Sequence, residues 1–130
     1  MHGRWELIHQ QPTVIVDVAH NEDGMKQLAE QLELATYRQL HIIVGMVKDK
    51  EITKSLAHLP KTAHYYFTKA QTPRALPEEN LKTVAATLNL QGATFPDVNA
   101  ALKEVLTHAH KDDLVLVCGS VFLVAEVEAP

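Results

Sequence analysis

Short apolar runs alternate with amphipathic segments along this chain, which predicts strands separated by helices. Residues 13–18, 40–44, 63–68 and 114–118 are near-continuous apolar runs, typical of strands that are buried on both faces. Shorter stretches at residues 5–8 and 93–95 predict two further strands. The pattern predicts an α/β fold: a Rossmann-like three-layer sandwich with a mostly parallel sheet of about six strands and helices on both faces.

Apolar residues at helical spacing occupy the segments between these strands. Met25, Leu28, Ala29 and Leu32 mark the first such segment, and they predict one buried stripe. We expect five helices. The first begins near Glu22, the second covers residues 51–59, and the third has Pro77 as its first helical position. The fourth follows Asp97 as its N-cap, and the fifth covers residues 121–127.

Size and composition restrict the class of protein. A chain of 130 residues with 46% hydrophobic and 22% charged residues fits one globular domain spanning residues 1–130. The net charge of −4 argues against nucleic acid as a partner, because phosphate binding needs a basic face. No apolar run approaches the ~20 residues that span a membrane, and the N-terminus lacks a signal peptide. We expect a cytoplasmic monomer.

Cysteine and histidine offer little chemistry of their own. The single cysteine, Cys118, lies in an apolar run and is interpreted as a core residue rather than a nucleophile. The eight histidines are scattered, and His108 and His110 would diverge on a helix. We therefore expect no metal site in this chain.

Polar residues follow the predicted strand that contains residues 13–18. Asp17 lies at its end, where an ionised carboxylate needs a partner, and His20 and Asn21 precede the next helix. In a parallel sheet, ligands bind beyond the carboxyl ends of the strands, so Asp17 could meet a ribose hydroxyl or a cation. The residues alone favour ligand binding and a structural role equally. In the structural role, Asn21 caps the helix and Asp17 accepts hydrogen bonds from loop amides.

A second candidate is the Gly119-Ser120 turn after the last strand. Ser120 would present its hydroxyl at a helix N-terminus, where an anion is favoured, or act only as an N-cap. Lys48 and Lys50 follow another strand end, and Arg74 follows a third. No P-loop, dinucleotide-binding glycine motif or activated nucleophile is recognisable. The residues alone therefore indicate an α/β domain with an edge that faces an anion or a nucleotide.

Five segments, in this order, resemble the C-terminal domain of folylpolyglutamate synthases, which belong to the Mur ligase superfamily. The similarity covers essentially the whole chain, and the second and last segments together are fairly specific to the folate branch. The segments are residues 3–6 (GRWE), 17–21 (DVAHN), Gly45 with 48–50 (KDK), 73–76 (PRAL) and 119–127 (GSVFLVAEV).

The resemblance implies an ATP-dependent amide ligase that adds glutamate to folate or dihydropteroate through an acyl phosphate. Its ATP and Mg²⁺ are expected in the full-length enzyme, where a larger N-terminal domain carries the P-loop and the magnesium ligands. That domain would be the partner of this one in the same chain. We expect no cofactor, and no activity, in this chain alone.

The resemblance also implies roles for four residues. Arg4 matches an arginine that reaches ATP phosphates, and Asp17 matches an acidic residue that contacts the nucleotide and takes part in catalysis. His20 matches a catalytic histidine at the cleft, near the incoming glutamate or the reacting phosphate, and Ser120 matches a serine that holds the glutamate carboxylate. Lys48, Lys50 and Arg74 receive no individual roles.

Two other interpretations stay open. The chain could be the corresponding domain of another Mur-type ligase, acting on peptidoglycan precursors or cyanophycin, although the 48–50 loop and the Gly119-Ser120 turn favour folate. It could instead be a free-standing nucleotide- or anion-binding module. We expect an excised part of a longer enzyme, in which Met1-His2 replaces the natural linker.

Overall fold

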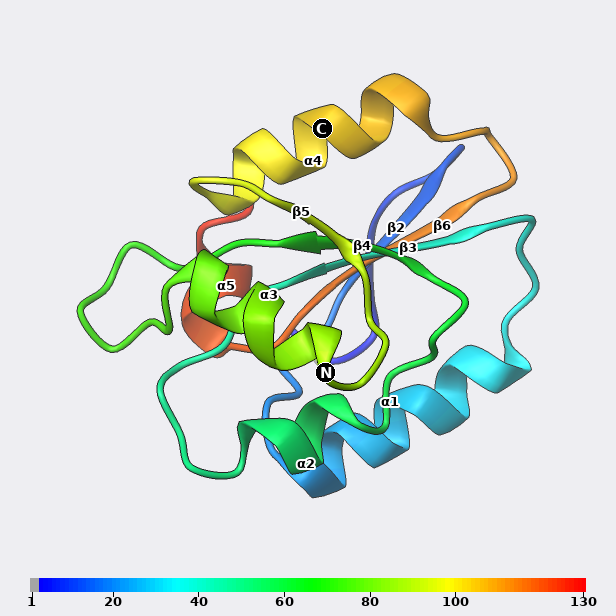
Figure 1. The fold of residues 1–130 in the computed structure, drawn as a ribbon. Coiled ribbons are helices and arrows are strands. Elements are labelled where there is room, and N and C mark those ends of the chain that lie inside the picture. Colours follow the sequence, from blue (N-terminus) through cyan, green and yellow to red (C-terminus); the bar gives the residue numbers. More distant parts are fainter. Residues whose placement is uncertain (1–2) are drawn as a thin grey trace.

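A computed structural model describes residues 3–130, so the expectation about Met1-His2 lies outside the described residues. The chain forms one six-stranded sheet with the order β1-β2-β6-β3-β4-β5 and helices on both faces (Figure 1). The strands are β1 (Glu6–His9), β2 (Thr13–Val16), β3 (Leu40–Val44), β4 (His64–Phe67), β5 (Gly92–Thr94) and β6 (Leu114–Cys118). The helices are α1 (Glu22–Leu34), α2 (Ile52–Leu56), α3 (Glu78–Ala86), α4 (Val98–His108) and α5 (Val121–Ala125).

Five strands run parallel, and β1 pairs antiparallel with β2 at one edge. The predicted α/β class and the mostly parallel sheet are therefore confirmed. Several ends differ from prediction by a few residues: β1 begins at Glu6, β2 ends at Val16, and α2 and α5 are shorter than predicted. These differences arise because apolar side chains continue past the last ladder or helical hydrogen bond.

Alternation along the strands divides the core into two layers. In β6, Leu114, Leu116 and Cys118 pack with α1, α2 and α3, whereas Val115 and Val117 pack with α4 and α5. Figure 1 shows α1 and α2 below the sheet and α4 above it. Because β6 is central and buried on both faces, its sequence is apolar at every position.

Helix N-termini are fixed by short polar side chains. Asn21 caps α1 by accepting the Gly24 amide, and Asp97 caps α4 by accepting the Ala100 amide, as predicted for Asp97. The prediction for Pro77 was wrong by one position: Pro77 is the N-cap residue of α3, with ψ of 141°. Its extended conformation explains the shift, because helical dihedrals begin only at Glu78.

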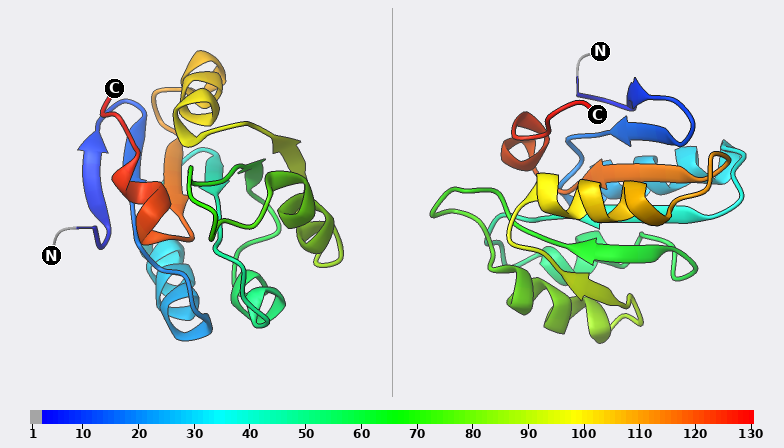
Figure 2. Two further views of the ribbon diagram at one scale, coloured as in Figure 1. Left: turned by 90° about the vertical axis from the view of Figure 1, so that its left-hand side faces the viewer. Right: turned by 90° about the horizontal axis from the view of Figure 1, so that it is seen from above.

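In the right-hand view of Figure 2, the carboxyl ends of the parallel strands lie at the same end of the sheet as α5 and the loop of residues 69–76. Since β1 is antiparallel, the residues that precede it reach this end too. Within residues 3–130, no helix is long and apolar enough to cross a membrane.

Candidate functional site

The carboxyl edge of the sheet, defined here as residues 3–5, 17–21, 45–50, 69–76 and 119–122, gathers the predicted site residues. Backbone hydrogen bonds join its segments: Val18 N–H donates to the Gly3 carbonyl at 2.7 Å, and Gly119 N–H donates to the Ala19 carbonyl at 2.9 Å. Segments more than 100 residues apart in the sequence therefore meet at one edge of the sheet.

Asp17 is buried, with 5% of its surface exposed, and its carboxylate accepts backbone amides. Oδ2 accepts Trp5 N–H at 3.0 Å, and Oδ1 accepts Ala19 N–H at 2.9 Å. Asp17 therefore has the structural role that the sequence left open: its carboxylate accepts hydrogen bonds from loop amides. A pocket of about 290 Å³ opens beside Asp17. A contact between Asp17 and a nucleotide stays a prediction.

Arg4 lies over Asp17, with Nε 4.0 Å from Oδ1, and its side chain is 47% exposed. The bend that brings it there begins at Gly3, whose φ of +80° is a left-handed conformation that suits glycine. Gly3 N–H also donates to Glu6 Oε1 at 2.9 Å. The guanidinium is therefore held near a buried acid while most of its donors remain accessible to an anion.

His20 is exposed at the start of α1, and Nδ1 lies 3.2 Å from the Val18 carbonyl. Its position at the carboxyl edge agrees with the prediction. The exposed imidazole is accessible to a substrate bound at this edge. Its catalytic role stays a prediction.

Ser120 is buried and is the N-cap of α5. Its Oγ accepts Phe122 N–H at 3.0 Å and Leu123 N–H at 3.4 Å. Gly119 has φ of +114°, and an added Cβ would lie 2.3 Å from the Gly45 carbonyl oxygen, so this turn requires glycine. The capping alternative is therefore present, and a contact between Ser120 and a glutamate carboxylate stays a prediction.

Three basic side chains project from neighbouring loops of the same edge: Lys48, Lys50 and Arg74 are all exposed. An antiparallel bridge between Val47 and Ala75 joins these loops. The Arg74 guanidinium lies over the Phe122 ring, 5.6 Å from its centroid. The edge therefore combines a buried acid with accessible cations, an arrangement suited to anionic ligands.

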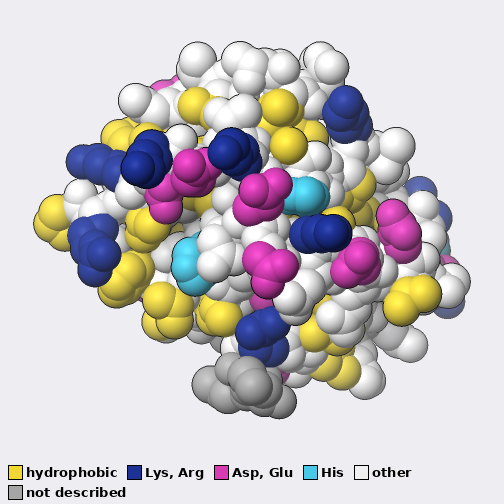
Figure 3. Space-filling view, turned by 90° about the horizontal axis from the view of Figure 1, so that it is seen from below, with side chains coloured by type: hydrophobic (Ala, Val, Ile, Leu, Met, Phe, Trp, Pro, Cys, Tyr) yellow, Lys and Arg dark blue, Asp and Glu magenta, His cyan; other side chains and the backbone are white. Residues whose placement is uncertain are grey.

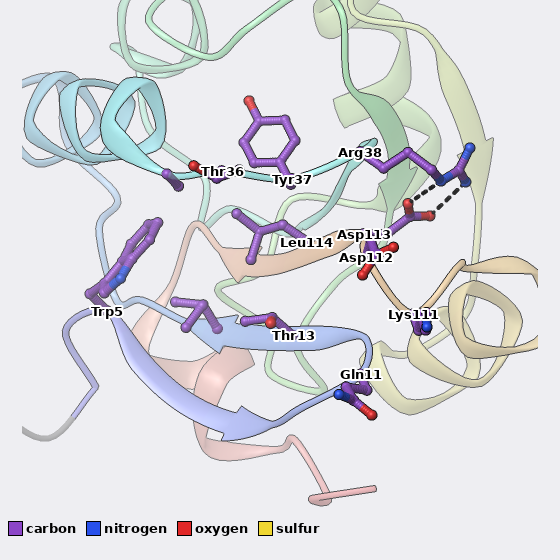
Figure 4. A pocket seen from close by; sticks show the side chains of 12 residues that line it. Trp5, Gln11, Thr13, Thr36, Tyr37, Arg38, Lys111, Asp112, Asp113 and Leu114 are labelled. Atoms are coloured by element: carbon purple, nitrogen blue, oxygen red, sulfur yellow. Dashed lines mark hydrogen bonds and ion pairs between the residues drawn. The ribbon is translucent and has the colours of Figure 1, made fainter.

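The sequence analysis did not predict a polar cluster at the opposite, amino edge of the sheet. Asp113 accepts hydrogen bonds from Arg38 Nε at 2.8 Å and Nη2 at 3.1 Å (Figure 4). It also accepts a hydrogen bond from His41 Nε2 at 2.9 Å. The Tyr66 hydroxyl lies 3.0 Å from His41 Nδ1, and His110 N–H donates to Asp113 Oδ2 at 2.9 Å. An Asp directly before a buried run and a His inside another were the available signals.

Titration behaviour separates these groups from catalytic ones. Burial alone would raise the pKa of Asp113, but hydrogen bonds from His41, the His110 amide and Arg38 outweigh it and lower this pKa to about 2. Burial, followed by the nearby Glu104 and Asp113 carboxylates, raises the pKa of Tyr66. Tyr66 therefore keeps its proton, and the cluster contains no activated nucleophile.

Metal binding finds no support within residues 3–130. No group of three His, Cys, Asp or Glu side chains among them could hold a metal ion. Cys118 is fully buried, which raises the pKa of its thiol and leaves it in the core, as expected. We therefore derive no step through a metal held by these residues.

The face formed by α1 and α2 differs from the carboxyl edge. Acidic and basic side chains are intermixed on it (Figure 3). Several are paired: His58 Nε2 lies 3.0 Å from Glu22 Oε2, and Lys54 Nζ lies 3.2 Å from Glu51 Oε2. Opposite charges on this face therefore partly neutralise one another.

Comparison with known proteins gives a consistent result. The family model described as "Mur ligase, glutamate ligase domain" matches residues 3–121. A probable bifunctional folylpolyglutamate synthase/dihydropteroate synthase of Haloferax volcanii is 38% identical over 125 residues, which cover 95% of this chain and 15% of that protein. The dihydrofolate synthase/folylpolyglutamate synthase of Escherichia coli is 32% identical over 127 residues, covering 96% of this chain and 29% of that protein.

A solved structure agrees with these relatives. The crystal structure of a bifunctional folylpolyglutamate synthase/dihydrofolate synthase with Mn, AMPPNP and L-glutamate bound superposes with a TM-score of 0.85 at 31% identity. The match covers 96% of this chain and 30% of that one. This chain therefore spans less than a third of the length of the proteins that it resembles.

Proposed function

Because this chain belongs to the Mur ligase family, in which it matches the glutamate ligase domain, we propose that it forms the C-terminal part of an ATP-dependent amide ligase. The ligase would add glutamate to folate or dihydropteroate, since relatives at 32% to 38% identity are named as folylpolyglutamate synthases. The observation that carries the proposal is the meeting of Arg4, Asp17, His20 and Ser120 at the carboxyl edge.

In this proposal, the carboxyl edge is one wall of a cleft and a preceding domain is the other. Arg4 binds ATP phosphates, for which a permanently charged, planar guanidinium is suited. Asp17 positions the Arg4-Trp5 segment through the Trp5 amide and contacts the nucleotide from the adjoining pocket. His20 lies near the incoming glutamate in this proposal. Its imidazole accepts a proton from the glutamate amine or passes that proton on.

ATP and a divalent ion would be shared with the preceding domain, which supplies the P-loop and the metal ligands in our proposal. Mg²⁺ held by that domain would neutralise charge on the phosphates. Closure of the two domains excludes water from the acyl phosphate, which hydrolysis would otherwise destroy. The carboxyl edge contributes charge and position to this closed state, and the chain alone is expected to be inactive.

The direct test uses the full-length protein that contains this chain. We expect it to transfer glutamate to dihydropteroate, to a reduced folate or to both, with release of ADP that depends on both acceptor and glutamate. The Arg4→Ala variant should lose roughly 100-fold in kcat/KM for ATP, while Lys103→Gln, on the exposed surface of α4, should match the wild type.

Two outcomes would redirect the assignment. Ligation that requires a muramyl peptide or an aspartate–arginine polymer in place of folate would identify another Mur-type ligase. Micromolar binding of ATP by residues 1–130 alone, measured by calorimetry, would support the free-standing module, because a single wall of a cleft should bind ATP only weakly.

A further inference from the structure

Trp5 has an unusual backbone conformation for a residue with a large side chain. Its φ is +46°, in the left-handed region that favours glycine and that a bulky residue rarely adopts. Such a conformation costs free energy, so it persists only where the surrounding structure holds it in place. Residues of this kind concentrate at functional sites, and Trp5 directly follows Arg4 at the carboxyl edge.

The backbone on both sides of Arg4 is tied to the segment that follows β2. Before Arg4, the Gly3 carbonyl accepts Val18 N–H at 2.7 Å. After Arg4, Trp5 N–H donates to Asp17 Oδ2 at 3.0 Å. Arg4 is therefore carried on a short bend, and both ends of this bend are attached to the same loop.

This bend brings the side chains of Arg4 and Trp5 to the same pocket. In a regular strand, successive side chains point to opposite faces of the sheet. Arg4 and Trp5 instead both line the pocket of about 290 Å³ that opens beside Asp17. The left-handed conformation of Trp5 is therefore linked to the direction of the Arg4 side chain, because an extended backbone would return the two side chains to opposite faces.

The indole of Trp5 anchors the bend to the core. Trp5 is half-buried and packs against the core layer that α1 covers. It also lines the larger pocket of about 470 Å³ that Figure 4 draws, so two pockets border this residue. A truncated side chain would leave the bend held only by its backbone hydrogen bonds.

We propose that Trp5 is a positioning residue for Arg4: its indole and its left-handed backbone hold the guanidinium near Asp17, where it meets the phosphates of ATP. This inference rests on the proposed ligase function, which assigns the phosphates to Arg4. Trp5 itself contacts no phosphate, so its whole contribution passes through Arg4. Substitution of Trp5 should therefore change the use of ATP and leave the use of glutamate unchanged.

The test is a double-mutant cycle in the full-length protein, with steady-state kinetics measured at varied ATP and at varied glutamate. Trp5→Ala should lower kcat/KM for ATP roughly 10-fold and leave KM for glutamate within about twofold of wild type. In the Arg4→Ala background, which already lacks the guanidinium, the same substitution should lower kcat/KM for ATP by no more than about twofold.

Two further variants separate positioning from a general loss of structure. Trp5→Phe should recover most of the activity, because it retains an aromatic ring in contact with the core. Leu7→Ala is the matched control, since Leu7 lies in β1, is 48% exposed and should behave as the wild type. If Trp5→Ala does not fold, Trp5→Leu replaces it in the same cycle, with a smaller loss expected because an apolar side chain still contacts the core.

The outcomes separate the two proposals. If the wild-type protein ligates glutamate but Trp5→Ala keeps its kcat/KM for ATP, the inference about Trp5 is wrong and the proposed function stands. Equal losses from Trp5→Ala in the wild-type and Arg4→Ala backgrounds would mean that Trp5 acts independently of Arg4, which overturns the inference. A wild-type protein that incorporates no glutamate with any folate acceptor would refute the proposed function itself.

Discussion

The two ends of the sheet treat charge in opposite ways. At the amino edge, the Asp113 carboxylate is fully buried and accepts hydrogen bonds from Arg38, His41 and the His110 amide. At the carboxyl edge, the Asp17 side chain is 7% exposed, and its partners are two backbone amides and Arg4, whose Nε lies 4.0 Å away. Lys48 and Arg74 lie nearby and are exposed.

In our proposal, this difference separates charges that stabilise the fold from charges that bind a ligand. The amino-edge cluster satisfies its own members, and within residues 3–130 no buried side-chain nitrogen or oxygen lacks a hydrogen-bond partner. The carboxyl edge keeps its cations accessible at the position where parallel sheets bind ligands. Substitutions at the amino edge should therefore change stability, and those at the carboxyl edge should mainly change activity.

The largest effect on stability is expected for Asp113→Ala. The variant would leave His41 and Arg38 without their buried acceptor, which costs about 3 to 5 kcal/mol of unfolding free energy. Urea denaturation followed by circular dichroism measures this loss. Asp112→Ala is the matched control, because that side chain is 65% exposed and should cost under about 0.5 kcal/mol. Equal losses in both variants would remove the contrast between the edges.

A second effect follows from the pKa of Asp113, which is lowered from 3.8 to about 2 in the folded chain. The folded state then binds the proton less readily than the unfolded state, so the stabilisation is complete above about pH 4. It is lost as pH falls towards 2, and it amounts to roughly 2 kcal/mol. Unfolding measured between pH 6 and 2 should show this loss in the wild type and a flatter profile in Asp113→Asn. Parallel profiles would exclude Asp113 as the cause.

The sequence predicted most of the fold because its strands and helices carry their own patterns. Residues 114–118 are apolar throughout, and α4 shows its buried stripe and its Asp97 cap directly. The order of strands and the antiparallel β1 do not follow from local pattern, because they depend on which runs pair across long separations.

The site was predictable in part for the same reason. Asp17, His20 and Ser120 follow strands, and parallel topology brings strand ends together. The amino-edge cluster joins Arg38 to Asp113, which are 75 residues apart in the sequence. No local motif therefore predicts this cluster. Whether Ser120 caps a helix or binds a ligand also depends on atoms that a sequence does not place, and the coordinates show the cap.

Asp17 provides the intermediate case. Asp17→Ala removes the acceptor of the Trp5 and Ala19 amides, and leaving them unsatisfied costs about 1 to 3 kcal/mol. We therefore expect a moderate loss of thermal stability together with a loss of ligase activity in the full-length protein. Asp17→Asn retains one carbonyl oxygen and should lose less stability. If Asp17→Ala unfolds as the wild type does, the amide contacts do not hold this edge together.

The smallest change in stability is expected for Arg4→Ala. Its side chain is 47% exposed and its Nε lies 4.0 Å from Asp17, a distance at which surface ion pairs contribute under about 1 kcal/mol. Urea denaturation should give a free energy within about 0.5 kcal/mol of wild type, although ligase activity falls. A loss above about 2 kcal/mol would make Arg4 a structural residue.

Amide hydrogen–deuterium exchange of the full-length protein, with and without Mg²⁺, a non-hydrolysable ATP analogue and glutamate, tests the division between the two edges most directly. We predict new protection in residues 3–5, 17–21, 45–50, 69–76 and 119–122, with no change at 38–41 and 110–114. Protection that appears at the amino edge and leaves the carboxyl edge unchanged would contradict the account.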